Sequence, residues 1–202
     1  MVCASWNNVE NEVDFTIEID KQMLIDEVPP NAKILDFGCG YGRIANELSL
    51  CGYKDIVGVD PSAKMIERGS LMYPELLLVH VSEGGLPYKK ETFDAVVACA
   101  VFTCLTSVND RVEAIAEIHR VLKPSGLFHI VEFCSEQPRE FESGYGIPML
   151  YSTPQELRDI LRPLVTIHQQ VIQAKTIGGN NALCFRALAR KSLNKTLQRT
   201  SR

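Results

Sequence analysis

Three glycines and an acid near the start of the chain have the types and spacing that bind a cofactor. Gly38, Gly40 and Gly42 form a G-x-G-x-G pattern that begins two residues after Asp36, at the end of an apolar run over residues 33–37. Glycines allow positive φ and the close approach of a ligand, and the N–H groups that open a helix face such a ligand. The stretch therefore predicts a strand, a cofactor-binding turn and a helix.

A second acid lies at the end of the next apolar run. Asp60 follows residues 55–59, where its carboxylate could accept hydrogen bonds from both hydroxyls of a ribose. The spacing differs from the G-x-G-x-x-G fingerprint of dinucleotide sites, so a ribose is implied more than a diphosphate. The tripeptide Asp60-Pro61-Ser62 is also an ordinary helix start with Ser62 as N-cap, and both interpretations hold at once.

The elements that must position these residues alternate between strands and helices, which predicts an α/β fold with a doubly wound sheet. Residues 137–152 break this periodicity and predict a loop, either a substrate wall or a plain surface loop. Thr153 to Glu156 form a capping-box pattern that starts a helix. The expected strands are residues 33–37, 55–59, 76–81, 93–98, 127–133, 165–173 and 181–189, of which the last two form a hairpin.

The length and net charge of the chain limit the classes of function that the protein can have. The chain has 202 residues, 46% of them hydrophobic, which suits one domain of ordinary size. A formal net charge of −4 gives no electrostatic footprint for nucleic acid or an anionic membrane, so a small substrate is favoured over a polyanion. No apolar run has the length of a membrane span and no signal-peptide layout is present, which predicts a cytoplasmic protein.

Seven cysteines are scattered along the chain, with no C-x-x-C pair and no Cys/His cluster at zinc spacing. They are interpreted as small buried hydrophobic residues in a reducing compartment, and no metal site is expected. Cys39 lies inside the glycine turn and Cys99 follows the fourth strand, so these two are expected to line the cofactor site through their backbones.

Four segments together resemble a known family: residues 34–43, residues 57–62, residues 86–88 followed by 93–97, and residues 119–126. The chain resembles a class I methyltransferase that uses S-adenosylmethionine (SAM), close to the small-molecule group that includes the ubiquinone and menaquinone enzymes. The resemblance implies a Rossmann-like seven-stranded sheet with an antiparallel C-terminal strand. It also implies methyl transfer from SAM to a small-molecule acceptor, with S-adenosylhomocysteine as product.

The resemblance also assigns roles to residues of the cofactor site. It implies that the turn from Gly38 to Gly40, aided by Asp36, holds the methionine part of SAM, and that Asp60 binds the ribose. The resemblance further implies that Pro61 and Met65, with Ser82 or Glu83, surround the adenine, and that the backbone of Cys99 closes the site. Ser82 stands where the family often has an acid, and the choice among Ser82, Glu83 and backbone groups is open.

No general base stands out. Thr103-Cys104 replaces a His-His pair that is common in related small-molecule enzymes. His129 is interpreted as a structural histidine inside a strand, and Glu132 is the first choice if a base exists. The catalytic residue is therefore unassigned, and a non-catalytic protein that binds SAM or a partner on the same fold is the alternative function.

The two ends of the chain are expected to lie outside the methyltransferase domain, which is assigned to residues 31–190. Residues 1–30 are rich in acids and predict either an amphipathic helix packed on the sheet or a lid that brings Trp6 and Phe15 to the substrate. Residues 191–202 carry cations and no acid, and predict a solvated, disordered tail.

Overall fold

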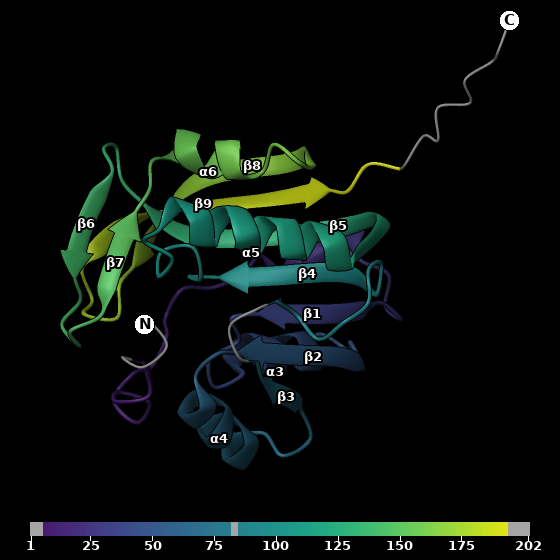
Figure 1. The fold of residues 1–202 in the computed structure, drawn as a ribbon, viewed down its shortest axis with the longest axis horizontal. Helices are drawn as coiled ribbons and strands as arrows, with labels where there is room; N and C mark the ends of the chain where they lie inside the picture. Colours follow the sequence, from purple (N-terminus) through teal and green to yellow (C-terminus); the bar gives the residue numbers. More distant parts are fainter. Residues whose placement is uncertain (1–5, 82–84, 194–202) are drawn as a thin grey trace, which may run out of the picture.

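The computed structural model describes residues 6–81 and 85–193, and its centre is a seven-stranded sheet in the order β3-β2-β1-β4-β5-β9-β8 (Figure 1). The strands β1 and β4 at its middle are almost fully buried, as expected of continuous apolar runs in a sheet covered on both faces. The strand bounds are β1 Lys33–Phe37, β2 Asp55–Asp60, β3 Leu77–His80, β4 Phe93–Cys99, β5 Leu122–Cys134, β8 Val165–Lys175 and β9 Asn181–Arg190.

Strand direction places the ligand-binding edge. Neighbours from β3 to β5 pair in parallel, whereas β9 is antiparallel to both β5 and β8. The predicted seven-stranded fold with an antiparallel C-terminal strand is confirmed. In open α/β sheets ligands bind beyond the carboxyl ends of the parallel strands, and here β1, β2 and β4 end at Phe37, Asp60 and Cys99.

Helices cover both faces of the sheet. One face packs against α5 and α6, and the other packs against α2 and α3, each through its own buried apolar cluster. The helix α4 contacts β2 and β3 at one edge. The helix bounds are α2 Lys21–Glu27, α3 Arg43–Leu50, α4 Ala63–Met72, α5 Val108–Val121 and α6 Pro154–Ile160.

Local capping explains where two of these helices begin. The Ser62 hydroxyl accepts a hydrogen bond from the Met65 N–H and caps α4. At α6, Thr153 and Glu156 form the reciprocal capping box, with Pro154 at the first helical position. Both predicted helix starts are confirmed.

Residues 137–152 differ from the predicted loop. They contain a two-stranded hairpin of β6 (Arg139–Glu142) and β7 (Pro148–Tyr151), which stands beyond one end of the large sheet (Figure 1). Its strands have four residues each, too few for an alternating pattern to be distinguished from a loop. Ile147, just before β7, is fully buried against the N-terminal segment.

Within the described residues, no helix has the length and apolar character needed to cross a membrane.

Candidate active site

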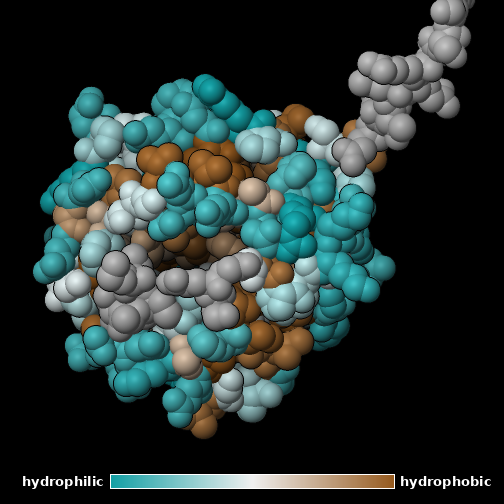
Figure 2. Space-filling view, viewed as in Figure 1, coloured by the Kyte–Doolittle hydropathy of each residue, from teal (hydrophilic) through white to brown (hydrophobic). Residues whose placement is uncertain are grey.

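A cavity of about 190 Å³ lies where β1, β2 and β4 end. Figure 2 shows hydrophobic side chains inside a hollow near the middle of the face of the molecule that it draws. The glycine turn and Asp60 form one side of the lining, and apolar or aromatic side chains form most of the rest. These are Trp6, Phe15, Ile17, Ile44, Met65, Val101, Leu105, Phe133, Met149 and Ile177.

The glycine turn has a backbone that other residues rarely adopt. The φ angles of Gly38, Gly40 and Gly42 are 72°, 54° and 83°. The N–H groups of Gly38 and Cys39 both donate to the Val59 carbonyl of β2, at 2.9 and 3.0 Å, which fixes the turn against the neighbouring strand. The turn therefore presents bare backbone to the cavity.

Side chains approach these glycines closely. A Cβ at Gly38 would lie 2.6 Å from a methyl group of Val101, and one at Gly40 would lie 3.1 Å from the ring of Phe15. Gly38 and Gly40 are thus required by close contacts as well as by φ.

Asp60 lies at the tip of β2 and lines the cavity. Its two carboxylate oxygens accept hydrogen bonds from the N–H groups of Gly40 and Ser62, both at 2.8 Å. Burial raises the pKa of Asp60 to about 6, although these two N–H donors and His80 oppose that shift. Each oxygen retains acceptor capacity for a ligand hydroxyl.

Asp36 lies outside the cavity lining. Its buried carboxylate accepts a hydrogen bond from the Ala45 N–H in the first turn of α3 at 3.0 Å. Burial raises the pKa of Asp36 to about 7, and the Ala45 N–H and the charge of Arg43 oppose the shift. Asp36 therefore fixes the start of α3, so any contribution to cofactor binding would be indirect.

The structure brings most of the other predicted residues together. Cys39, Pro61, Met65 and Cys99 all line the cavity beside the glycine turn. Ser82 and Glu83, the two candidates for adenine recognition, lie outside the described residues.

Arg43 lines the cavity although the sequence analysis assigned it no role. Its guanidinium donates to the Ile17 carbonyl and forms an ion pair with Glu47 at 2.7 Å. Its buried Nε has no hydrogen-bond partner among the described residues. The signal available in sequence was the position of Arg43 as the first residue after the third glycine, which also suits an ordinary helix start.

Residues 6–20, called the strap here, cross the mouth of the cavity. Arg68 of α4 donates to the Glu10 and Val13 carbonyls at 2.6 and 2.7 Å. The Tyr41 hydroxyl accepts from the Phe15 N–H at 3.3 Å, and the two rings are stacked with centroids 5.5 Å apart. The strap is therefore held in part through its backbone carbonyl and N–H groups, which composition does not reveal.

The strap and the β6–β7 hairpin share a small apolar cluster, called the roof cluster. Val9, Val13 and Ile147 are its buried members, and Trp6, Phe15, Tyr145 and Met149 pack around them. The Tyr145 hydroxyl also donates to the Glu12 carbonyl at 3.2 Å. Two segments about 130 residues apart thus form one wall of the cavity.

Glu132 was the sequence-based first choice for a base, and the structure corrects this. The buried carboxylate accepts hydrogen bonds from the N–H groups of Val101, Phe102 and Thr103 and from the Thr103 hydroxyl, at 2.7–2.9 Å. Burial raises the pKa of Glu132 to about 6, against these donors. Glu132 does not line the cavity, and its carboxylate instead holds the loop after β4.

His129 has the structural role that its strand position predicted. Its Nδ1 donates to the Ala187 carbonyl at 2.9 Å, so its Nε2 accepts from the Asp20 N–H at 3.3 Å. Burial lowers the pKa of His129 to about 4. The neutral ring therefore ties the end of the strap to β5.

The cavity cysteines are protonated at neutral pH. Burial raises the pKa of Cys39, Cys99 and Cys104 above the usual value. A thiol in this form is a weak nucleophile, so these side chains act as apolar lining.

Comparisons with known proteins agree with this geometry. A methyltransferase-domain family matches residues 35–130. The ubiquinone/menaquinone biosynthesis C-methyltransferase UbiE of Wigglesworthia glossinidia brevipalpis is 30% identical over 172 residues, which cover 76% of this chain and 68% of that protein. A tRNA (carboxymethyluridine(34)-5-O)-methyltransferase of Arabidopsis thaliana is 34% identical over 113 residues, covering 56% of this chain and 27% of that protein.

The solved structures agree on the fold. The crystal structure of a SAM-dependent methyltransferase from Methanosarcina mazei superposes with a TM-score of 0.78 at 23% identity, over 85% of this chain and 97% of that chain.

The chain spans only 27–49% of the length of the first five curated relatives that it matches. The family and the cofactor that the resemblance of four sequence segments implied are confirmed, and the chain belongs to the class I SAM-dependent methyltransferases.

Proposed function

We propose that this protein transfers the methyl group of SAM to a small, largely apolar acceptor. One observation carries the proposal: the glycine turn and Asp60 share a single cavity with a wall that includes Trp6, Phe133 and Met149. Binding sites for small molecules are commonly apolar with a few fixed polar groups.

The residues of the cavity fit the cofactor. Bare backbone at Gly38 to Gly40 suits the methionine part, and the Asp60 carboxylate suits the two ribose hydroxyls. Pro61 and Met65 offer apolar surface for adenine. The unpartnered Nε of Arg43 is a donor for the carboxylate of the methionine part.

Bound SAM supplies an electrophilic methyl group on a sulfonium, which departs as a neutral thioether. The protein therefore need not protonate the leaving group, and its main task is to place the acceptor atom about 3 Å from the methyl carbon. Among the described residues that line the cavity, Asp60 is the one carboxylate and there is no imidazole. This lining favours an acceptor that arrives as a nucleophile, such as an amine, a thiolate or an ionised ring, over an alcohol that needs a base.

The strap serves as the lid in this proposal. A cavity of 190 Å³ is smaller than the usual range of small-ligand sites, roughly 300–1,000 Å³, and the Phe15 ring lies directly on Gly40. Movement of the strap would enlarge the cavity toward that range. Closure over the substrate would exclude water through the roof cluster.

A nucleic-acid acceptor is disfavoured by charge. The strap carries five acids and no lysine or arginine, and the whole chain has a net charge of −4. Three of these acids, Glu10, Asp14 and Asp20, pair with cations of other segments, which leaves Glu12 and Glu18. A phosphate backbone would be repelled there. The tRNA methyltransferase relative matches over only a quarter of its own length.

Calorimetric titration with SAM, S-adenosylhomocysteine and NAD tests the cofactor half of the proposal. We expect binding of the first two and none of NAD, with at least a tenfold loss in Asp60→Ala. Asp55→Ala is the matched control, because Asp55 begins the same strand and pairs with Lys33 at the surface, away from the cavity. Binding of NAD in place of SAM would overturn the proposal.

Methyl transfer is then measured with SAM labelled in its methyl group and a panel of apolar amines, thiols, phenols and quinols. Label in an extractable product supports the small-molecule acceptor. Cofactor binding with no turnover on this panel would favour the non-catalytic alternative, and label in added tRNA would replace the small acceptor by a nucleic acid.

A further inference from the structure

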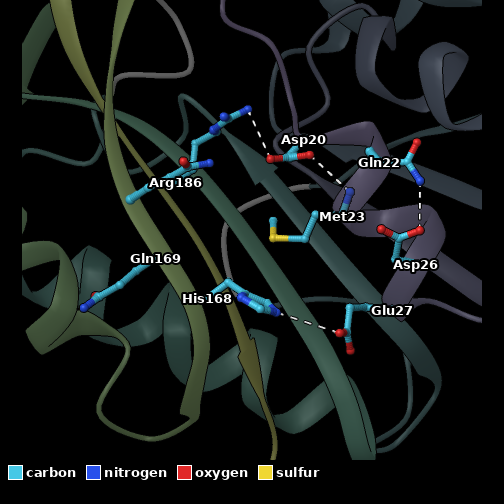
Figure 3. A pocket seen from close by; sticks show the side chains of 9 residues that line it. Asp20, Gln22, Met23, Asp26, Glu27, His168, Gln169 and Arg186 are labelled. Carbon is cyan, nitrogen blue, oxygen red and sulfur yellow. Dashed lines mark hydrogen bonds and ion pairs between the residues drawn. The ribbon is translucent and has the colours of Figure 1, made fainter.

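A second cavity, called the α2–β8 groove, lies apart from the cofactor cavity. It has a volume of about 390 Å³ and runs between α2 with its N-cap Asp20, on one side, and β8 and β9 on the other (Figure 3). No residue of the described ranges lines both cavities. The volume falls in the usual range of small-ligand sites, roughly 300–1,000 Å³.

One end of the groove holds an arginine with few partners. Arg186 of β9 is mostly buried, with 18% of its side chain exposed, and its guanidinium lies 3.5 Å from the Asp20 carboxylate. Its Nε is buried and has no hydrogen-bond partner in the described part of the chain. Asp20 also caps α2 by accepting a hydrogen bond from the Met23 N–H, so its carboxylate pairs with only some of the N–H donors of Arg186. A guanidinium in this position has donors to spare for a carboxylate.

The other end of the groove is acidic. Glu27, at the last residue of α2, lies 3.8 Å from the His168 ring and 3.3 Å from Arg190. Asp26 lies beside it and accepts a hydrogen bond from the Gln22 amide. The carboxylates of Asp26 and Glu27 thus outnumber the permanent cation Arg190 at this end.

An apolar side chain separates the two ends. Met23 lies between the Asp20–Arg186 pair and the Glu27–His168 pair in Figure 3, and its thioether points into the groove. Asp20 and Glu27 are seven residues apart, or about 10 Å along a helix. The groove therefore offers a donor end, an apolar middle and an acceptor end in line.

We propose that the α2–β8 groove binds a small elongated zwitterion of the ω-amino carboxylate type. Its carboxylate pairs with Arg186, its methylene chain packs on Met23, and its ammonium group pairs with Glu27. A simple anion would leave the acidic end at Asp26 and Glu27 without a ligand cation, and a simple cation would leave the free Arg186 donors without an acceptor. Only a ligand with both charges satisfies both ends.

The test uses the full chain and three probes of matched length: 6-aminohexanoate, hexanoate and hexylamine. Chemical-shift titration should show saturable binding of 6-aminohexanoate at residues 20–27 and 168–170, with hexanoate and hexylamine at least tenfold weaker. The binding should persist with SAM present, because the two cavities share no residue. Equal binding of the three probes, or shifts elsewhere only, would overturn the proposal.

Variants locate each charge. Arg186→Gln and Glu27→Gln should each weaken 6-aminohexanoate at least tenfold, whereas Arg162→Gln should not, since Arg162 is 76% exposed and pairs with Asp159 outside the groove. Glu27 is 31% exposed, so Glu27→Gln keeps the test valid if the more buried Arg186→Gln fails to fold. Unchanged affinity in Glu27→Gln would contradict the assignment. None of these measurements depends on methyl transfer.

Discussion

The two sides of the cofactor cavity are built in different ways. The glycine turn and Asp60 stand on the ends of buried parallel strands, and their positions are fixed by hydrogen bonds to β2 and to α4. The opposite wall, made by the strap and the β6–β7 hairpin, has its own roof cluster of three buried residues. One side therefore shares the main core, and the other rests on a small satellite core.

This difference indicates that the two sides of the cavity have different mobility. A group on the main sheet loses its position only when the whole domain unfolds, whereas a satellite cluster of few residues can open locally at low cost. We therefore expect the cofactor side to be rigid and the roof to move as substrate enters. The variants below test whether the two sides respond separately.

The largest effect is expected at Glu132, which holds the loop between the two sides. Glu132→Gln replaces a carboxylate that accepts four hydrogen bonds by an amide with one acceptor oxygen, and leaves buried N–H groups unpaired. We expect a loss of about 3 kcal/mol in the free energy of unfolding. Urea titration measures this, and Glu140→Gln on the exposed face of β6 is the control. Equal stability of the two variants would show that the loop does not depend on Glu132.

The sequence predicted the sheet-borne side directly, whereas it offered the lid (residues 1–30) and the substrate wall (residues 137–152) only as alternatives and did not indicate that the two segments pack together. Gly38, Gly40 and Asp60 were found because each follows directly on an apolar strand, so the signal lies within a few residues. The roof depends on contacts such as Val13 with Ile147, between segments about 130 residues apart, which no local pattern encodes. Glu132 was the first choice for a base, if one exists, and the structure corrects this for a related reason, because the donors around a carboxylate are visible only in three dimensions.

A smaller effect is expected from adding a methyl group at Gly38. Gly38→Ala carries the strain of a positive φ and also brings Cβ to 2.6 Å from Val101. Gly179→Ala is the control, because Gly179 has φ of +76° and nothing within 4 Å. We expect unfolding free energies lower by about 2–3 kcal/mol for Gly38→Ala and about 1 kcal/mol for Gly179→Ala. A similar loss in both would mean that Val101 moves aside freely.

The cofactor side should also show a pH signature. Asp60 has a pKa of about 6, so its carboxylate is ionised above that pH and becomes protonated as pH falls through it. A protonated carboxyl group accepts fewer hydrogen bonds from the ribose hydroxyls than a carboxylate does. The affinity for SAM should therefore fall up to tenfold between pH 6 and pH 5, which corresponds to about 1.4 kcal/mol of binding free energy. In Asp60→Asn the affinity should be lower at pH 7 and nearly flat over this range. A slope that persists in Asp60→Asn would assign the pH dependence to another group, such as Asp36.

The smallest effect on overall stability should come from loosening the strap. Arg68→Gln removes the donors to the Glu10 and Val13 carbonyls and the guanidinium that lies 4.0 Å from the Tyr41 ring. Because the roof cluster is small, we expect hydrogen exchange to rise about fivefold, roughly 1 kcal/mol, at residues 13–15 while the strands β1 and β4 keep their protection. Arg162→Gln is the control for loss of a surface charge. Faster exchange in β1 as well would mean that the strap and the sheet open together, and the distinction between a rigid cofactor side and a mobile roof would then fail.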